Sequence, residues 1–205
     1  FCFRARRGRG GVVYRPPRGA DQTWAGDQNA PNFARIREWL DLDIVSIPRN
    51  TLARVDVTPS TGPGYTLVRD APSAPNFALD AGVAGWTLFT SASADTVGGG
   101  LSRLVLQDVK PAKALSVDAL AGHRGETFDG LAYEVSLFEE PESAGEDGRS
   151  RYWATLSAVA LSEDQRERAA AVNARTQGWA FAIDQVGFNR LTQPLDEIAE
   201  PDGDA

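Results

Sequence analysis

The stretch RTQGWAFAID, residues 175–184, contains the end of one predicted element and the start of the next. Gly178 suits the position just after a helix, where a left-handed backbone costs glycine nothing. Trp179, Phe181 and Ile183 then alternate with alanine, which is the period of a β-strand. Large side chains on one face and alanines on the other fit under a helix. The stretch therefore predicts a strand that closes the core of an α+β fold; a ligand-stacking platform is the alternative.

The helix before this strand is predicted from Ser162 through about Gln177. The segment SEDQ, residues 162–165, matches the capping-box pattern that opens many helices. Further upstream, ETFDGLAYEVSLFEE (126–140) and RYWATLSAVAL (151–161) alternate over long runs and predict two strands. The hydrophilic segment PESAGEDGRS between them predicts a hairpin loop with its turn at Asp147-Gly148.

A second β-rich block precedes these elements. LARVDVTP (52–59), GYTLVRD (64–70) and NFALD (76–80) predict three strands of an antiparallel meander, with a turn at Gly62-Pro63-Gly64. Residues 95–107 have helical spacing of apolar residues, with Asp95 or Thr96 as the N-cap, although the run Gly98–Gly100 weakens this helix.

Together these elements predict an α+β fold made of two antiparallel meander or hairpin blocks, about 52–80 and 127–161, in repeat-like units. The helices near 95–107 and 162–177 are expected to lie across the blocks. Whether the blocks form one continuous sheet or two small ones stays open.

The two ends of the chain give weaker signals. Residues 11–25 predict strand, turn and strand, and APNFARIREWL (30–40) predicts a short helix that Asn32 can cap. Near the other end, apolar residues share one helical face but Pro194 interrupts them, so we expect a kink or two short helices. These residues are Phe188, Leu191, Leu195 and Ile198. The segment PDGDA (201–205) is expected to be frayed.

Composition bounds the class of protein. The 205 residues are 42% hydrophobic and 24% charged, as in ordinary globular proteins. The net charge of −7 is unevenly distributed, because six arginines and no acid in residues 1–20 leave −13 on the rest. The arginine-rich start can bind nucleic acid or anionic lipid, but a frayed leading segment explains it more simply. The acidic body repels phosphate backbones, so no nucleic-acid partner is expected.

The scarcity of cysteine and histidine limits the chemistry further. Cys2 and His123 are each the only residue of their type, which excludes an internal disulfide, a cysteine-based zinc site and a histidine metal cluster. No metal and no cofactor are expected. The uncharged stretch Ala81–Ala94 is too short to span a membrane. Because methionine is absent even at position 1, we expect a processed or truncated product whose signal peptide or anchor lies upstream.

Few side chains combine into a candidate site. His123 can pair with Glu126 or Asp129, and serines are available as nucleophiles, but none lies in a G-x-S-x-G segment; a turn histidine between Gly122 and Gly125 is the simpler interpretation. These serines are Ser116, Ser136 and Ser157. A carboxylate group near the hairpin loop can hold calcium or simply be solvated. Its members are Glu139, Glu140, Glu142, Glu146 and Asp147.

Two other features are candidate binding sites. The glycines 98–100 lack the Lys-Ser or Lys-Thr of a phosphate loop, which argues against a nucleotide role. Five tryptophans can line a carbohydrate groove, although each falls in or beside a predicted element, as core residues do. They are Trp24, Trp39, Trp86, Trp153 and Trp179. No catalytic, metal or cofactor residue is assigned.

The order of the segments resembles a known family. REWLDLDIVSIPRNTLARVDVT, FALD, LSRLVLQDVKPA, TFDGLAYEVSLFEE, RYWATLSA, VNARTQGWAFAID and FNRLTQPLDEI occur in this order between residues 37 and 198. The set is similar to the bacterial family called domain of unknown function 4340, which includes auxiliary components of ABC transport and gliding-motility systems. The resemblance spans roughly residues 11–200, and VNARTQGWAFAID carries it best. The glycines 98–100, Pro194 and the arginine-rich start depart from the family pattern.

The resemblance implies repeated α+β units behind a membrane anchor, on the periplasmic face of the cytoplasmic membrane. Residues 1–30 are then the arginine-rich start and the last hairpin of a truncated preceding unit, 31–200 the α+β domain, and 201–205 a tail. The implied function is a non-enzymatic accessory or scaffold domain whose partners are ABC transporter subunits. The alternatives are a binding module for an envelope glycan or small ligand and, less favoured, a hydrolase that uses His123.

Overall fold

The computed structural model describes residues 4–8, 11–15, 24–26, 47–141 and 150–202, and the chain divides into two compact units, 1–40 and 41–205. In the first unit, β1 (Arg4–Gly8), β2 (Gly11–Arg15) and β3 (Trp24–Gly26) form a three-stranded antiparallel sheet. The predicted strands around residues 11–25 are confirmed. The expectation of a frayed start is wrong for β1, because β2 supplies a full hydrogen-bonding partner along it. The helix predicted at 30–40 lies outside the described residues.

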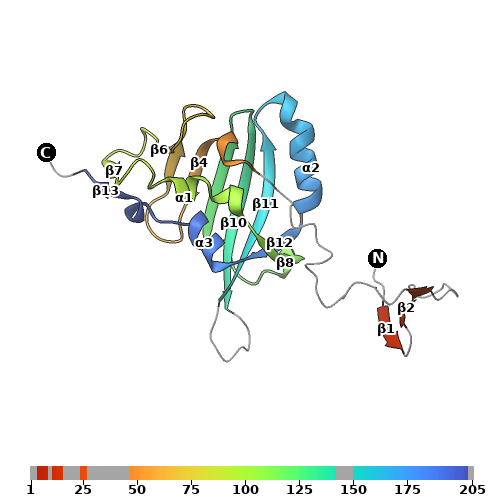
Figure 1. Ribbon diagram of the computed structural model, residues 1–205. Helices are drawn as coiled ribbons and strands as arrows, with labels where there is room; N and C mark the ends of the chain where they lie inside the picture. Colours follow the sequence, from red (N-terminus) through yellow and green to blue (C-terminus); the bar gives the residue numbers. More distant parts are fainter. Residues whose placement is uncertain (1–3, 9–10, 16–23, 27–46, 142–149, 203–205) are drawn as a thin grey trace. The chain divides into compact units, whose positions relative to one another are not determined.

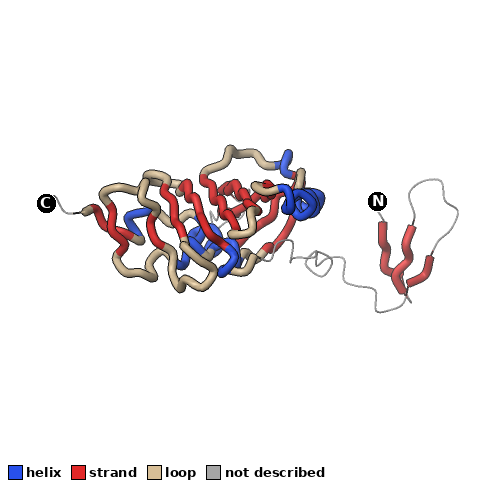
Figure 2. Tube along the Cα trace, turned by 90° about the horizontal axis from the view of Figure 1, so that it is seen from above, coloured by secondary structure: helices blue, strands red, loops and turns tan. Residues whose placement is uncertain are grey.

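The second unit is built on one eight-stranded antiparallel sheet (Figures 1 and 2). Its strand order is β6-β5-β4-β9-β10-β11-β12-β8. The strands are β4 (Leu52–Thr58), β5 (Tyr65–Val68), β6 (Ala78–Leu79), β8 (Leu106–Pro111), β9 (Ala121–Thr127), β10 (Leu131–Pro141), β11 (Ser150–Ala160) and β12 (Trp179–Ile183). The α+β fold is confirmed, and the two predicted β blocks join into one sheet where β4 pairs with β9.

One face of this sheet forms the hydrophobic core. Successive residues of a strand point to opposite faces, and paired residues share a face. Val57, His123, Val135 and Leu156 form one such row across β4, β9, β10 and β11, and all four are buried. Figure 1 shows the short helices α1 and α3 lying over the sheet, whereas α2 lies alongside β11. The opposite face carries the polar residues of the same strands.

The helix predicted at 95–107 ends much earlier than expected. Helix α1 covers only Asp95–Gly98, the 3₁₀ turn η3 covers Gly100–Arg103, and the chain then enters strand β8. A Cβ atom on Gly98 would lie 2.5 Å from the ring of Phe77, and one on Gly100 would lie 2.8 Å from Leu191. These glycines therefore allow close packing in the core rather than helix continuation.

The predicted capping of α1 is also wrong. Its N-cap residue is Ala94, which makes no side-chain cap. The Asp95 carboxylate instead accepts a hydrogen bond from the Phe77 amide at 3.0 Å and pairs with Arg49 at 2.6 Å. The side chain that the sequence offers for capping thus fixes the chain that enters β6.

Helix α2 and its ends match the prediction in part. The chain passes through the 3₁₀ turn η5 (Glu163–Gln165) into α2 (Arg166–Thr176). Ser162 makes no capping hydrogen bond, so the predicted capping box does not form. Gly178 has φ +81°, which confirms the predicted left-handed residue after the helix, and β12 begins directly after it.

The C-terminal segment forms two short helices, as expected for a chain interrupted by Pro194. Helix α3 (Gln185–Leu191) begins at Asp184, whose carboxylate accepts a hydrogen bond from the Gly187 amide at 2.6 Å. The 3₁₀ turn η6 (Leu195–Glu197) follows Pro194. The four residues predicted to share a face are all buried, namely Phe188, Leu191, Leu195 and Ile198. Two further 3₁₀ turns are η2 (Arg49–Thr51) and η4 (Ala112–Ala114).

The end of the described chain is paired rather than frayed. Strand β13 (Ala199–Pro201) pairs with β7 (Trp86–Leu88) in a separate two-stranded sheet. The Asp202 amide also donates to the Gly85 carbonyl at 2.9 Å, and Thr87 Oγ1 donates to the Asp202 carboxylate at 2.6 Å. The expectation of a frayed tail is therefore wrong for Pro201 and Asp202, since both main-chain and side-chain bonds hold them. Residues 203–205 lie outside the described range.

Candidate functional site

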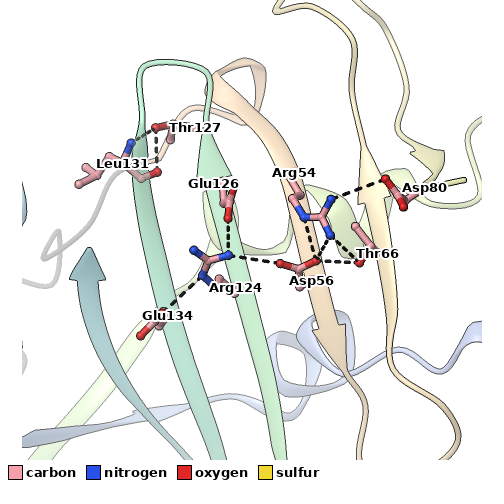
Figure 3. Close-up of polar contacts among 9 residues, drawn as sticks. All are labelled: Arg54, Asp56, Thr66, Asp80, Arg124, Glu126, Thr127, Leu131 and Glu134. Carbon is pink, nitrogen blue, oxygen red and sulfur yellow. Dashed lines mark hydrogen bonds and ion pairs between the residues drawn. The ribbon is translucent and has the colours of Figure 1, made fainter. Parts of the chain in front are cut away.

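The polar face of the eight-stranded sheet carries a cluster of charged side chains, which we call the charge cluster. Its members are Arg54, Asp56, Asp80, Arg124, Glu126 and Glu134 (Figure 3). Asp56 is paired with Arg124 across β4 and β9, and Arg124 with Glu134 across β9 and β10. Direct cross-strand partners lie side by side, so the three strands hold opposite charges next to one another.

The two arginines connect the members of the charge cluster. Arg124 reaches Asp56 and Glu134 at 3.4 Å each and also pairs with Glu126. Arg54 Nε donates to Asp56 Oδ1 at 3.1 Å, and its Nη1 lies 3.6 Å from Asp80. Thr66 adds a hydroxyl that donates to Asp56 at 2.7 Å.

The charge cluster contributes more to the surface potential than to stability. Two guanidinium groups against four carboxylates leave a net charge of −2. The side chains are between about a quarter and a half exposed, and water screens ion pairs of this kind to about 1 kcal/mol or less each. The arrangement therefore presents an ordered surface with a net negative charge.

A groove lies next to the charge cluster on the same face. Its volume is about 250 Å³. It runs between β10 and β11 on one side and the end of α2 and the start of β12 on the other. Its lining residues are Ala112, Glu134, Ser136, Thr155, Leu156, Ser157, Thr176, Gln177, Gly178 and Trp179. Glu134 belongs to both the groove and the charge cluster.

The large apolar residues of the stretch 175–184 lie in different environments. Phe181 and Ile183 are buried in the main core, and Ala180 and Ala182 pack with Trp153 on the other face. Trp179, in contrast, is 45% exposed and lines the groove. The prediction of core closure is confirmed for Phe181 and Ile183 and wrong for Trp179, because the pairing of β12 with β11 runs only as far as Phe181.

The other tryptophans lie elsewhere. Trp153 is buried, with Lys110 and Arg151 4.1 and 4.8 Å from the centre of its ring. Trp86 is half-buried in β7, and the side chains of Trp24 and Trp39 lie outside the described part of the chain. Among the tryptophans whose side chains are described, Trp179 is the one that is exposed and lines the groove.

His123 is a core residue and not the turn histidine that the neighbouring glycines suggested. It lies in β9 and is 2% exposed, because its row of the sheet faces the core. Its Nδ1 donates to the Leu191 carbonyl at 3.0 Å, and its Nε2 has no hydrogen-bond partner in the described residues. Burial lowers the pKa of His123 to about 4, outweighing the opposite effects of the Leu191 carbonyl and Asp56.

The structure does not assemble the side chains proposed as partners of His123. Glu126, Ser136 and Ser157 lie in registers that place them on the polar face, opposite the imidazole. Asp129 is bound by Thr127 and Arg168, and Ser116 donates to Glu140. Ser136 and Ser157 instead both line the groove.

We expect the buried imidazole to make stability depend on pH. The unfolded chain binds a proton on His123 near pH 6.5, whereas the folded chain does so only near pH 4. Stability is therefore complete above pH 6.5 and falls as the pH drops toward 4. Linkage gives a loss of about 2 kcal/mol from this group between pH 7 and pH 5.

Urea unfolding of the parent chain and of His123→Leu at both pH values measures this loss. The comparison concerns the change between pH values, so a lower stability of the variant does not affect it. Between pH 7 and pH 5, the free energy of unfolding of His123→Leu is expected to fall by about 2 kcal/mol less than that of the parent. Equal losses in the two proteins would contradict a neutral, buried His123.

The predicted acidic cluster is only partly described. Glu139 and Glu140 lie in β10, whereas Glu142, Glu146 and Asp147 fall outside the described residues. Glu140 pairs with Lys110 and accepts a hydrogen bond from the Ser116 amide at 2.9 Å. Within the described ranges, no group of three or more histidine, cysteine or acidic residues is placed to hold a metal ion. The described helices are also too short or too polar to cross a membrane.

The sequence gives a partial signal for the residues that line the groove. Glu134, Ser136, Thr155 and Ser157 alternate with apolar residues along β10 and β11, which marks the solvent face of a hairpin. The sequence does not predict that these residues lie beside Trp179, because Trp179 belongs to β12 and reaches the groove only through the turn at Gly178.

Comparison of the chain with protein-family models, curated proteins and solved structures found no match.

Proposed function

We propose that this chain is a non-enzymatic accessory domain of the bacterial envelope that binds subunits of an ABC transport system. The ordered segments that resemble domain of unknown function 4340 support this assignment and its location on the periplasmic face of the cytoplasmic membrane. The observation that carries the binding role is the charge cluster. It places five charged side chains on the paired strands β4, β9 and β10 and a sixth, Asp80, directly after β6, with a net charge of −2.

Electrostatic complementarity explains how such a surface selects a partner. Rigid strands fix the spacing of the carboxylates, so a partner with arginine or lysine at matching positions meets them without reordering the domain. Charges of opposite sign accelerate the encounter and exclude partners with like charges. The surface of the transporter subunit that docks here is therefore expected to be basic.

The test is capture of partners by the tagged chain from gently solubilised native membranes, followed by mass spectrometry. The proposal expects enrichment of an ABC permease or ATPase. The double variant Asp80→Lys/Glu126→Lys reverses two charges of the cluster. It should reduce this enrichment at least about tenfold, because like charges then face the partner.

A matched control is the double variant Glu163→Lys/Asp164→Lys in η5, which changes the net charge by the same amount at exposed positions away from the cluster. It should capture the transporter subunit as the parent does. Failure of the parent chain to enrich any transporter subunit would overturn the proposed function. Equal losses in both double variants would overturn the role of the charge cluster.

A further inference from the structure

We propose that the groove beside Trp179 binds one ring of a neutral sugar. This inference does not depend on the transporter proposal, because it rests on the lining of the groove. The observation that carries it is an exposed tryptophan beside one carboxylate and three hydroxyl side chains that have no partner in the described residues. These hydroxyl groups belong to Ser136, Thr155 and Ser157. A fourth hydroxyl in the lining, that of Thr176, already donates to the Val172 carbonyl.

The polar groups of the groove are available to a ligand. Ser136 is the cross-strand partner of Thr155, and Glu134 is the partner of Ser157, so these side chains form two adjacent pairs on one face. The hydroxyl groups of Ser136, Thr155 and Ser157 make no hydrogen bond to any other described residue. Glu134 contacts Arg124 at 3.4 Å through Oε1, which leaves Oε2 to accept hydrogen bonds.

Main-chain bonds hold Trp179 in position. The Gly178 carbonyl accepts a hydrogen bond from the Ala112 amide at 2.8 Å. Trp179 itself is paired with Pro111 at the end of β8. The left-handed Gly178 turns the chain from α2 into β12 at this point. The indole therefore stands on a fixed backbone, as a preformed binding site requires.

The chemistry of the lining selects the class of ligand. A sugar ring has an apolar C–H face that packs on an aromatic side chain and a rim of hydroxyl groups that both donate and accept hydrogen bonds. Glu134 accepts from such hydroxyls, and the serine and threonine hydroxyls can do either. Of the residues that line the groove, none is basic, so phosphate or carboxylate ligands find no opposite charge there. A neutral sugar satisfies all of these groups.

The size of the groove supports a small ligand. Its volume of about 250 Å³ lies just below the roughly 300–1,000 Å³ that is typical of pockets for drug-sized molecules. The groove is open to solvent, so the remaining residues of a glycan can extend away from it. We therefore assign one sugar ring to the groove and the rest of the glycan to solvent.

Isothermal titration with neutral tetrasaccharides of glucose, N-acetylglucosamine, xylose and mannose tests the assignment. At least one should bind with a Kd of about 1 mM or tighter. Trp179→Ala should weaken that binding at least about tenfold. The control Phe89→Ala removes an aromatic side chain that is 51% exposed outside the groove, and it should leave the Kd unchanged.

A charge test separates sugar binding in the groove from stacking on any exposed ring. Tetragalacturonate should bind more weakly than the neutral sugars, because its carboxylates meet Glu134. Glu134→Gln should weaken the neutral sugar several-fold and reduce the discrimination against the acidic one. No binding by any neutral sugar, or binding that Trp179→Ala leaves intact, would overturn the proposal. A preference for tetragalacturonate in the parent chain would overturn the assignment of a neutral ligand.

Discussion

Replacing Phe77 with alanine is expected to lower the free energy of unfolding by about 3–5 kcal/mol. Phe77 is 1% exposed and lies just before β6. Its ring packs so closely on Gly98 that a Cβ atom there would lie 2.5 Å away. The Arg69 guanidinium carbon lies 4.0 Å from the centre of the same ring. Removal of the ring therefore opens a cavity that the neighbouring backbone cannot fill.

Phe77→Ala is expected to cost more than most large-to-small core substitutions, because the Arg69 side chain packs on the same ring. Arg69 is itself only 6% exposed, and it donates to the Arg49 carbonyl at 2.9 Å. Without the aromatic face, a buried guanidinium loses a favourable contact that is worth about 1–2 kcal/mol when desolvated. Phe77→Leu keeps most of the apolar volume and is expected to cost about half as much as Phe77→Ala.

Urea unfolding of the parent and the two Phe77 variants measures these differences. Phe89→Ala is the control, because Phe89 is exposed, and it should change the free energy of unfolding by less than about 0.5 kcal/mol. If Phe77→Ala cost no more than this control, the packing of Phe77 against Gly98 and Arg69 would be contradicted. Equal costs for Phe77→Leu and Phe77→Ala would assign the loss to the aromatic face rather than to the cavity.

The elements predicted correctly are those whose signals, such as strand alternation or a glycine after a helix, lie within the element itself. The alternation along β10 and β11 and the left-handed Gly178 between α2 and β12 all appear within a few residues of the element concerned. They need no knowledge of partners, because period and turn chemistry act within one segment. For the same reason the antiparallel meander β4-β5-β6 was predicted from its turns.

Long-range pairing determined the elements that were predicted wrongly. The helix predicted over residues 95–107 does not reach its expected end, because β8 begins at Leu106 where β12 offers its edge, as in the pair of Lys110 with Ala180. His123 has glycines nearby, and its buried position follows only from pairing with Val57 and Val135. The exposure of Trp179 likewise depends on where β12 separates from β11. None of these partners is near in sequence, so a local pattern cannot reveal them.

Asn173 shows how a single side chain replaces a missing stretch of strand pairing. Strand β12 pairs with β11 only between Tyr152 and Ala154, so the edge of β11 at Ala158 lacks a strand neighbour on that side. The Asn173 amide fills this place from α2. Its Oδ1 accepts from the Ala158 amide, and its Nδ2 donates to the Ala158 carbonyl, each at 2.8 Å. Both main-chain groups are thereby satisfied at a residue that is 4% exposed.

Asn173→Ala is therefore expected to lower the free energy of unfolding by about 1.5–5.5 kcal/mol. Two main-chain groups lose their partners, at about 1–3 kcal/mol each, and the higher helix propensity of alanine returns about 0.5 kcal/mol. Urea unfolding measures the total, and hydrogen exchange at the Ala158 amide locates it. Glu167→Ala, at an exposed position of the same helix, should change neither quantity appreciably.

The exchange measurement distinguishes the bonding role of Asn173 from a general effect on helix α2. Asn173→Asp keeps the acceptor for the Ala158 amide but places a carboxylate oxygen against the Ala158 carbonyl. Protection of that amide should therefore fall less in Asn173→Asp than in Asn173→Ala, although both variants are less stable than the parent. Unchanged protection at Ala158 in Asn173→Ala would show that water or a neighbouring group replaces the side chain. The edge of β11 would then not depend on α2 for its hydrogen bonds.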